Sequence, residues 1–319
     1  MKAPKPKVLI TGGAGFIGSH VADAYLVEGY EVTVLDNLSS GRREHVPSGA
    51  RFVQADIGSP DSRALLETGG FVVLNHHAAQ MDVRVSVENP TFDAQANILG
   101  LLNLLEGARR GGVRRVVFAS SGGVVYGEGE RLPHAETAPK LPVSPYGVSK
   151  LASEYYLAAY AQLYGLESVS LRYSNVYGPR QNPHGEAGVV AIFGNRLRHG
   201  KSLTVYGNGE QTRDYVYVGD VARANLAATR WRVPAVGVLD DAAFNIGTGV
   251  ETSVNHLARL MIEAAGGLGR VDHGPARAGE LMRSALATAK AERELSWQPK
   301  TALADGLRLT YQWLKEAAA

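Results

Sequence analysis

Residues 11–18 read Thr-Gly-Gly-Ala-Gly-Phe-Ile-Gly and follow the short β-prone run Lys7–Thr11. After them, apolar residues recur at helical spacing as far as Gly29. Strand, glycine turn and helix in this order form a dinucleotide-binding unit, because backbone N–H groups at the helix N-terminus can approach a pyrophosphate. The glycines fit two spacings of the motif, one starting at Gly12 and the other at Gly13.

The next expected strand, Glu31–Leu35, ends at an acidic residue, Asp36. In this type of fold a carboxylate at that position accepts hydrogen bonds from the adenosine ribose hydroxyls and repels a 2′-phosphate. The sequence therefore favours NAD over NADP, although Arg42 and Arg43 leave NADP open. An aspartate that only ends a strand and opens a turn is the other interpretation.

Further strands alternate with helical segments along the first half of the chain. Strands are expected over 51–55, 71–75, 113–119 and 169–173, and long helices over 90–110 and 144–164. This alternation predicts an α/β fold with a Rossmann-like doubly wound parallel sheet. Because ligands bind at the carboxyl ends of parallel strands, we expect the site among the segments that follow them, which are Gly12–Gly18, Asp36, Asp56, 78–80, 120–122 and 174–175.

The composition changes after Asn175 to Gly, Pro and polar residues. Later strands are expected over 203–209, 213–218 and 244–249, and helices over 189–199, from an Asp220 cap to about Trp231, over 252–265 and over 303–314. We expect residues 1–175 to form the NAD-binding Rossmann domain, with 214–248 returning to it. Residues 176–213 and 249–319 are expected to form a smaller C-terminal substrate-binding lobe.

Composition narrows the class of protein. The 319 residues are 45% apolar and 20% charged, which is typical of a globular protein with a large core. A net charge of +2 without a long basic run argues against nucleic acid as a partner. The absence of cysteine excludes disulfides and thiol nucleophiles, and no helical His-Glu-x-x-His motif accompanies the nine histidines, so no metal site is expected. No apolar run is long enough for a membrane span, which makes a cytoplasmic location the default expectation.

The stretch Ser144–Lys150 reads Ser-Pro-Tyr-Gly-Val-Ser-Lys. Pro145 suits the first turn of a helix, which puts Tyr146 and Lys150 one turn apart on the same face. A nearby ammonium favours the phenolate, so Tyr146 could accept a proton near neutral pH. Taken alone, such a pair is more often simply solvated.

Together these segments resemble the extended short-chain dehydrogenase/reductase family, and within it the nucleotide-sugar epimerases. The likeness covers nearly the whole chain and rests on 11–18, 36–37, 56–57, 77–79, Asn97, 120–127, 146–150, 171–175, 213–216 and 277–280. The resemblance implies a tightly bound NAD cofactor and a UDP-sugar substrate, and it is nearest to members that interconvert UDP-glucose and UDP-galactose. It also implies a homodimer, in which 90–110 and 144–164 pair with a second subunit as a four-helix bundle.

The resemblance implies a role for each half of the tyrosine and lysine pair. Tyr146 would remove the sugar 4-OH proton while hydride passes from C4 to NAD⁺. Lys150 would hold the nicotinamide ribose and lower the tyrosine pKa. The 4-keto sugar would then rotate in the site and take the hydride back on its other face, which regenerates NAD.

The residues around each ligand also follow from the resemblance. The expected cofactor contacts are Gly12, Gly15, Phe16, Ile17, Gly18, Asp36, Asn37, Asp56, Ile57, Ala78, Ala79, Gln80, Asn97, Ser120, Tyr146, Lys150 and Tyr173. The expected substrate contacts are Gly122, Tyr146, Asn175, Val189, Tyr206, Arg213, Arg277 and Glu280. The guanidinium groups of Arg213 and Arg277 suit a diphosphate, although either could instead form a surface ion pair.

One position departs from the family pattern. Members usually carry Ser or Thr where this chain has Gly122, and that hydroxyl contacts both the tyrosine and the sugar O4. We assign the hydroxyl role to Ser121, with Ser120 or a water molecule as alternatives. Both serines could also simply end a strand.

The sequence is also compatible with other substrates and roles. The related 4,6-dehydratases carry an Asp-Glu pair where this chain has Gly123-Val124, which disfavours dehydration. The resembling epimerases often carry a bulkier residue beside the sugar 2-position where this chain has Ser284, so the resemblance implies that N-acetylated sugars are also accepted. A uronic acid epimerase or decarboxylase, an enzyme for dTDP-sugars, and a non-catalytic NAD-binding sensor are the alternatives, but a sensor would need neither Tyr146 nor Lys150.

Overall fold

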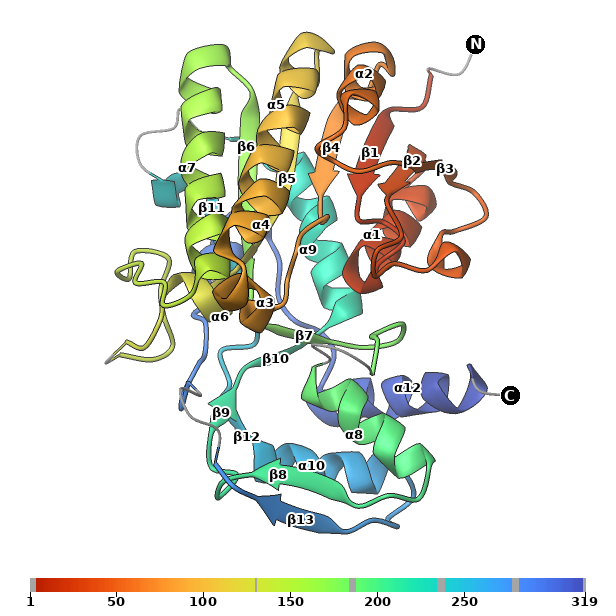
Figure 1. Cartoon of the computed structure of the whole chain (residues 1–319), viewed down its shortest axis with the longest axis vertical. Coiled ribbons are helices and arrows are strands. Elements are labelled where there is room, and N and C mark those ends of the chain that lie inside the picture. The colour runs from red at the N-terminus through yellow and green to blue at the C-terminus, as the bar shows by residue number, and fades with distance from the viewer. Residues whose placement is uncertain (1–3, 130, 184–187, 234–238, 277–280, 318–319) are drawn as a thin grey trace.

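The computed structural model describes residues 4–129, 131–183, 188–233, 239–276 and 281–317 (Figure 1). A parallel seven-stranded sheet organises the first part of the chain, in the order β11-β6-β5-β4-β1-β2-β3. Its strands are β1 (Lys7–Thr11), β2 (Glu31–Asp36), β3 (Arg51–Gln54), β4 (Val73–His76), β5 (Arg115–Ser121), β6 (Glu167–Tyr173) and β11 (Ala243–Ile246). The order reverses direction between β1 and β4, which confirms the predicted Rossmann-like doubly wound fold.

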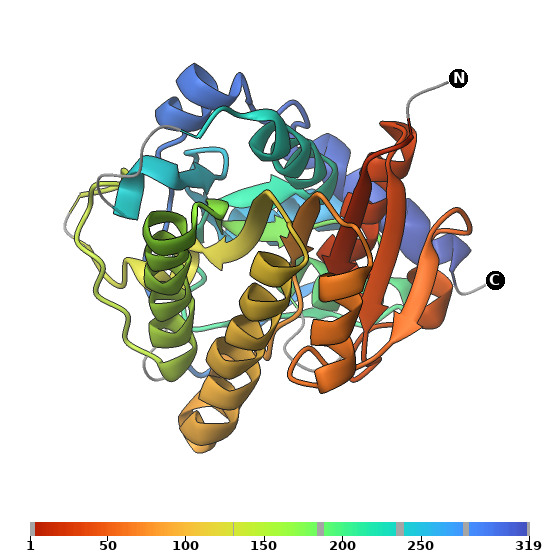
Figure 2. The same ribbon diagram turned by 90° about the horizontal axis from the view of Figure 1, so that it is seen from above.

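Helices cover both faces of this sheet, as Figure 2 shows from above. One face carries α2 (Pro60–Thr68), α5 (Gly100–Arg110) and α7 (Pro145–Tyr164). The other carries α1 (Phe16–Val27), α9 (Val218–Arg230) and α11 (Ala289–Leu295). Shorter connecting elements are η1 (Arg43–His45), α3 (Val83–Glu88), α4 (Pro90–Ala94), η2 (Gln95–Leu99), α6 (Gly122–Val125) and η3 (Leu239–Ala242).

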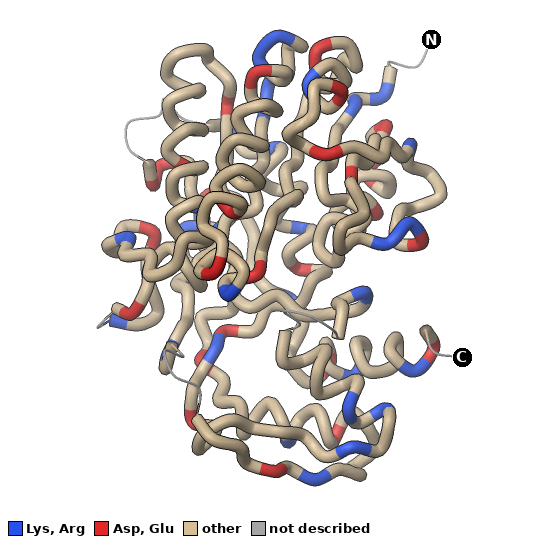
Figure 3. The backbone as a smooth tube through the Cα atoms, in the orientation of Figure 1, with Lys and Arg blue, Asp and Glu red and all other residues tan. Residues whose placement is uncertain are grey.

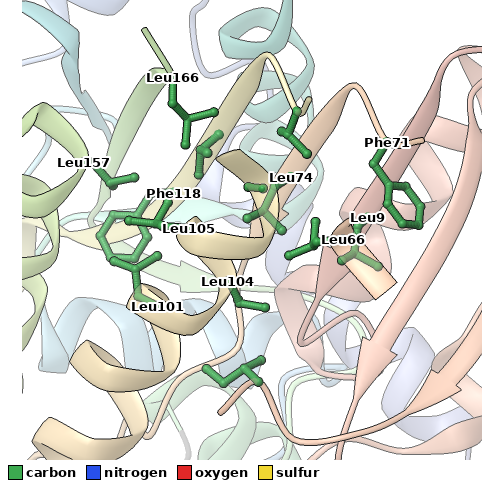
Figure 4. Packing of buried hydrophobic residues seen from close by; sticks show 14 of the residues in the cluster. Leu9, Leu66, Phe71, Leu74, Leu101, Leu104, Leu105, Phe118, Leu157 and Leu166 are labelled. Atoms are coloured by element: carbon green, nitrogen blue, oxygen red, sulfur yellow. The ribbon is translucent and has the colours of Figure 1, made fainter. Parts of the chain in front are cut away.

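A large apolar cluster lies between the sheet and the helices α2, α5 and α7 (Figure 4). Leu74 and Phe118 from the strands pack among Leu66, Leu105 and Leu157 from the helices, and all five are almost fully buried. Burying each such side chain contributes about 1.5–3 kcal/mol. This packing fixes α7, which carries the predicted catalytic pair, against the sheet.

A smaller set of elements forms the lower part of Figure 1. It consists of β7 (Asn175–Tyr177), α8 (Val189–Arg198), β8 (Leu203–Tyr206), β9 (Thr212–Arg213), β10 (Tyr215–Tyr217), β12 (Thr252–Ser253), α10 (Val254–Ala264), β13 (Val271–Gly274) and α12 (Leu303–Glu316). These elements share their own buried apolar cluster. The Ser253 hydroxyl accepts from the His256 N–H at 3.2 Å and caps α10, which begins within the range 252–265 expected for this helix.

We propose the domain division that the sequence suggests, with one refinement. The cluster shared by α8, α10 and α12 supports a separate substrate lobe. Ala291, Leu295 and Trp297, however, pack with the sheet and α9. Residues 289–297 therefore lie with the Rossmann domain, although they fall within the range 249–319 that the sequence assigns to the lobe.

Several predicted elements differ in their bounds from the structure, and the strand expected over 213–218 is divided into β9 and β10. Two helices differ for a reason that the structure shows. The helix expected over 90–110 contains a π-helical turn at Gln95–Leu99, which periodicity cannot reveal because its apolar positions fit an α-helix equally well. The helix expected to start at an Asp220 cap begins at Val218 instead. The Asp220 carboxylate is buried and accepts from the backbone N–H groups of Lys300 and Thr301, so it ties the helix to the C-terminal segment.

Charged residues of both signs are interspersed along the described chain in both parts of the molecule (Figure 3). None of the helices in the described ranges combines the length and apolarity that a membrane crossing requires.

Candidate active site

The glycine turn between β1 and α1 is shaped by close contacts that only glycine permits. Gly12 has a φ of +67°, and a Cβ on it would lie 2.6 Å from the backbone nitrogen of Ala78. A Cβ on Gly18 would lie 2.3 Å from the carbonyl oxygen of Gly12. Gly15 precedes α1 and has no side chain to cap it, so N–H groups of the first turn, which includes Phe16 and Ile17, are left for an anionic ligand. The turn fits a dinucleotide pyrophosphate.

Asp36 joins this turn to the end of β2. Its Oδ2 accepts from Ala14 N at 3.0 Å and its Oδ1 accepts from Leu38 N at 2.8 Å. Each carboxylate oxygen keeps a second lone pair, so Asp36 can also accept from ribose hydroxyls. The two arginines that left NADP open have other partners: Arg42 pairs with Glu44, and the Arg43 guanidinium lies over the Phe52 ring.

The segments after β3 and β4 are held by polar side chains. Asn37 Nδ2 donates to Asp56 Oδ2 at 2.9 Å. Asn97, in the π-helical turn, exchanges two hydrogen bonds of 2.9 Å with the backbone of Gln80. A π-helical turn often marks a functional position, and here it turns the amide of Asn97 toward the loop that contains Ala78 and Ala79. The Ile57 side chain is buried in the apolar core.

The predicted catalytic pair lies at the start of α7. Ser144 caps this helix by accepting from Gly147 N at 3.2 Å. Lys150 Nζ donates to the Ala119 carbonyl at 2.9 Å and lies 5.7 Å from the centroid of the Tyr146 ring. Tyr146 is half-buried, whereas Lys150 is only 4% exposed. Burial lowers the pKa of Lys150 to about 8, against the opposing charges of Asp93 and Glu154.

The structure separates the two candidate serines of β5. Ser120 is buried and its hydroxyl donates to Glu154 Oε1 at 2.5 Å. Glu154 also accepts three hydrogen bonds from Arg172, including Nη2 to Oε2 at 2.6 Å. Ser121 is partly exposed at the end of the strand, and its side chain faces away from that of Ser120 because neighbouring strand residues alternate. Ser121 is thus the more available hydroxyl.

Leu286 explains why glycine is present at position 122. A Cβ on Gly122 would lie 2.5 Å from Leu286 Cδ1, and Leu286 is fully buried. A serine or threonine at 122 would therefore require Leu286 to move. No pattern in the sequence links these two residues.

The predicted substrate contacts come from the sheet edge and from the lobe. Asn175 is exposed at the start of β7, while Arg213 on β9 is half-buried and donates through Nη1 to the Thr212 carbonyl at 2.8 Å. Val189 begins α8 and Tyr206 ends β8. Arg277 and Glu280 lie outside the described residues.

Tyr173, a predicted cofactor contact, ends β6 beside the segment that follows β4. Its ring stacks on His77 with 6.2 Å between centroids, and its hydroxyl accepts from Asn225 Nδ2 at 2.8 Å. The ring therefore has a fixed orientation at the carboxyl edge of the sheet.

Three charged residues near the pair are missing from the sequence prediction. Asp93 is fully buried on α4, and Glu154 and Arg172 form an ion pair with both side chains buried. Glu154 could have been found, because it lies one helical turn after Lys150. Asp93 gives a weaker signal, an acidic residue one turn before Asn97.

Comparison with known proteins agrees with this geometry. The model of the NAD dependent epimerase/dehydratase family matches residues 8–247. A putative UDP-glucose 4-epimerase of Methanocaldococcus jannaschii is 46% identical over 308 residues, which are 97% of this chain and 98% of that protein.

Two solved structures are similar over almost their whole length. UDP-glucose 4-epimerase of Thermotoga maritima with UDP-glucose has a TM-score of 0.91 and 43% identity, covering 98% of this chain and 100% of that one. The Thermus thermophilus UDP-glucose 4-epimerase complex with NAD has a TM-score of 0.87 and 45% identity, covering 98% of this chain and 99% of that one.

Two relatives named for other sugars are about 30% identical to this chain. A UDP-N-acetylglucosamine 4-epimerase of Methanobrevibacter ruminantium is 31% identical with a TM-score of 0.91, covering 99% of this chain and 100% of that one. A UDP-glucuronate 4-epimerase of Thermodesulfobacterium geofontis is 30% identical over 320 residues, which are 97% of this chain and 96% of that protein.

Proposed function

Because this chain belongs to the NAD-dependent epimerase/dehydratase family and is an NAD-dependent isomerase of UDP-sugars, we propose that it interconverts UDP-glucose and UDP-galactose. The observation that carries the catalytic assignment is the pairing of Tyr146 with the buried Lys150. The choice of sugar is supported by the relatives above 40% identity, which are named for UDP-glucose.

We assign cofactor binding to the carboxyl edge of the sheet. The first turn of α1 would hold the pyrophosphate, and Asp36 would accept from the adenosine ribose. Asn37 and Asp56 would border the adenine end, and Lys150 would donate to the nicotinamide ribose. When bound there, NAD supplies a hydride acceptor and donor for C4 of the sugar.

Proton transfer at the sugar 4-hydroxyl is assigned to Tyr146. The Lys150 ammonium, held beside the ring by the Ala119 carbonyl, stabilises the phenolate, so Tyr146 can accept the proton and later return it. Ser121 would orient the same hydroxyl, because Ser120 already donates to Glu154. Asn175, Arg213 and Arg277 are proposed to bind the UDP moiety.

A second substrate class is favoured by Ser284. This small residue is buried two positions before Leu286, which packs on Gly122. We propose that UDP-N-acetylglucosamine is therefore accepted as well. Gly123 and Val124 provide no acid and base for dehydration, so epimerisation is the favoured reaction.

The test is incubation of the purified holoenzyme with UDP-galactose, UDP-N-acetylglucosamine or UDP-glucuronate, with C4 configuration followed by NMR. We expect turnover of the first two sugars. Tyr146→Phe should abolish turnover and keep bound NAD, while the matched variant Tyr156→Phe, exposed on the same helix, should retain both. Absence of turnover on all three sugars with UDP still bound would favour a sensor.

We also propose a homodimer. Large apolar side chains are exposed along α4, η2 and α7, where Leu99 is 58% and Leu163 is 70% exposed, together with Phe92 and Tyr155. An exposed apolar face of this kind is typical of an interface between subunits. Sedimentation should show a dimer, and Leu163→Glu should shift it toward monomer.

A further inference from the structure

Asp93 is a fully buried carboxylate that accepts hydrogen bonds from three neutral groups of the described residues. Its Oδ2 accepts from the Ser149 hydroxyl at 2.6 Å. Its Oδ1 accepts from Asn97 Nδ2 and from Gln80 Nε2, each at 3.0 Å. A carboxylate is rarely buried without a compensating positive charge, because neutral donors replace only part of its hydration. The site should therefore contain a cation for which Asp93 is the counter-charge.

Lys150 is the cation adjacent to this network. It follows Ser149 directly in α7, and the group that accepts from its Nζ is the neutral Ala119 carbonyl. Two carboxylates act on the lysine charge, Asp93 more strongly than Glu154. Glu154 already has a partner of opposite charge in Arg172. Asp93 and Lys150 therefore remain as a complementary buried pair.

We infer that Asp93 is the buried counter-charge that keeps Lys150 an ammonium beside Tyr146. The inference deepens the proposed function, because the ammonium is what makes the phenol an effective base. Asp93 contacts Ser149, Asn97 and Gln80, so it acts through the lysine and is a positioning residue.

The other titratable groups facing Lys150 do not take over this role. His76 ends β4 and His77 follows it, and both have a pKa lowered by burial, with the lysine charge adding to the effect. The pKa of His77 falls to about 3, and that of His76 falls well below its usual value. Both imidazoles stay neutral while Lys150 titrates, and Arg172 is matched by Glu154.

Removal of the Asp93 charge should therefore move the titration of Lys150. Burial favours the neutral amine, and an opposite charge nearby favours the ammonium by about one pH unit or more. In Asp93→Asn the lysine should lose its proton at a pH lower by that amount. The alkaline limb of the pH–rate profile should move in the same direction, with activity partly recovered in more acidic buffer.

The experiment uses the full-length holoenzyme with ¹⁵N-labelled lysine. The Lys150 side-chain signal is assigned by its loss in Lys150→Arg and then titrated by NMR. Asp93→Asn is nearly isosteric; it removes the charge and also replaces one acceptor oxygen with an NH2 donor, so one of the three hydrogen bonds changes as well. Ser149→Ala is the matched control, since it removes the 2.6 Å bond but keeps the carboxylate. Asp61→Asn, an exposed carboxylate on α2, controls for net charge.

We expect a lower titration midpoint in Asp93→Asn and an almost unchanged one in Ser149→Ala and Asp61→Asn. An unchanged midpoint in Asp93→Asn, or an equal shift in Ser149→Ala, would overturn the inference. The NMR titration needs no turnover. A lower Lys150 midpoint in Asp93→Asn, combined with no epimerase activity of the native holoenzyme, would therefore support the charge pair and reject the proposed function.

A second variant keeps the test valid if Asp93→Asn does not fold. Asp93→Ser also removes the carboxylate, so the Lys150 signal should again titrate at a pH lower by about one unit or more. A Lys150 midpoint that stays as in the native protein would contradict the pairing.

Discussion

The contact between Gly122 and Leu286 gives a prediction whose size can be worked out from the structure. A Cβ added at Gly122 would lie 2.5 Å from Leu286 Cδ1 and 2.8 Å from Cδ2. Leu286 has little freedom to retreat, because it is fully buried and its backbone N–H donates to Asp214 Oδ2 at 3.2 Å. Overpacking of this kind costs about 1–3 kcal/mol, so Gly122→Ala should destabilise the fold by that amount.

The neighbouring glycine provides a matched control. A Cβ on Gly123 would meet only the Ser121 hydroxyl oxygen, at 3.9 Å. Gly123→Ala lies in the same short helix and should change the free energy of unfolding by about 0.5 kcal/mol or less. A difference between the two alanine variants therefore isolates the contact with Leu286 from the general effect of replacing glycine.

A double-mutant cycle tests the mechanism. Leu286→Ala alone should cost about 2–5 kcal/mol, because it leaves a cavity. In the double variant the methyl group of the Gly122→Ala substitution has room. The combined cost should therefore fall below the sum of the two single costs by about 1–3 kcal/mol. The same relief should let Gly122→Ser fold with a hydroxyl at the position where the family usually has one.

Urea unfolding at one fixed NAD concentration measures these differences, because bound cofactor itself stabilises the folded state. Equal unfolding midpoints for Gly122→Ala and Gly123→Ala would refute the reasoning. So would strictly additive costs in the cycle, since the clash would then not involve Leu286.

Three further outcomes are expected. Glu154→Gln should lower the free energy of unfolding by about 3–5 kcal/mol in denaturant titrations, since both partners of the ion pair are buried, and a cost below about 1 kcal/mol would contradict this. Asp36→Ala should weaken NAD binding more than NADP binding in fluorescence titrations, whereas an unchanged ratio would argue against a ribose contact. Because burial lowers the pKa of Lys150 to about 8, the ammonium that supports the base is present below that pH, and turnover should fall as pH rises through it; a rate that stays flat well above it would contradict this role.

The parts of the fold that follow from local chemistry could be predicted from the sequence. The glycine turn requires a positive φ at Gly12 and a close approach of the Ala78 backbone. Glycine meets both requirements, so the spacing of the glycines can be recognised in the sequence. The Ser253 cap of α10 is a local rule of the same kind. Because the carboxyl ends of parallel strands share one edge, the strand pattern alone places Asp36 and Ser120 at the same edge.

Features that depend on partners distant in the sequence could not be predicted. Asp220 looks like a helix cap, but its carboxylate accepts from Lys300 and Thr301. The role of Asp93 depends on Ser149, which belongs to another helix. Such contacts leave no periodicity or spacing, so only the folded arrangement reveals them.

The two serines at the end of β5 show how a contact distant in the sequence affects the choice of a site residue. The sequence offers Ser120 and Ser121 equally, and alternation along a strand requires that they face opposite sides without saying which side holds the substrate. The ion pair of Glu154 and Arg172 supports the proposal of Ser121, because Ser120 donates to Glu154 from the buried side. The same pair neutralises Glu154 and leaves Asp93 to balance Lys150. The ion pair of Glu154 and Arg172, which lies behind the residues proposed to contact substrate, therefore supports two proposals. One is Ser121 as the sugar-facing hydroxyl, and the other is Asp93 as the counter-charge.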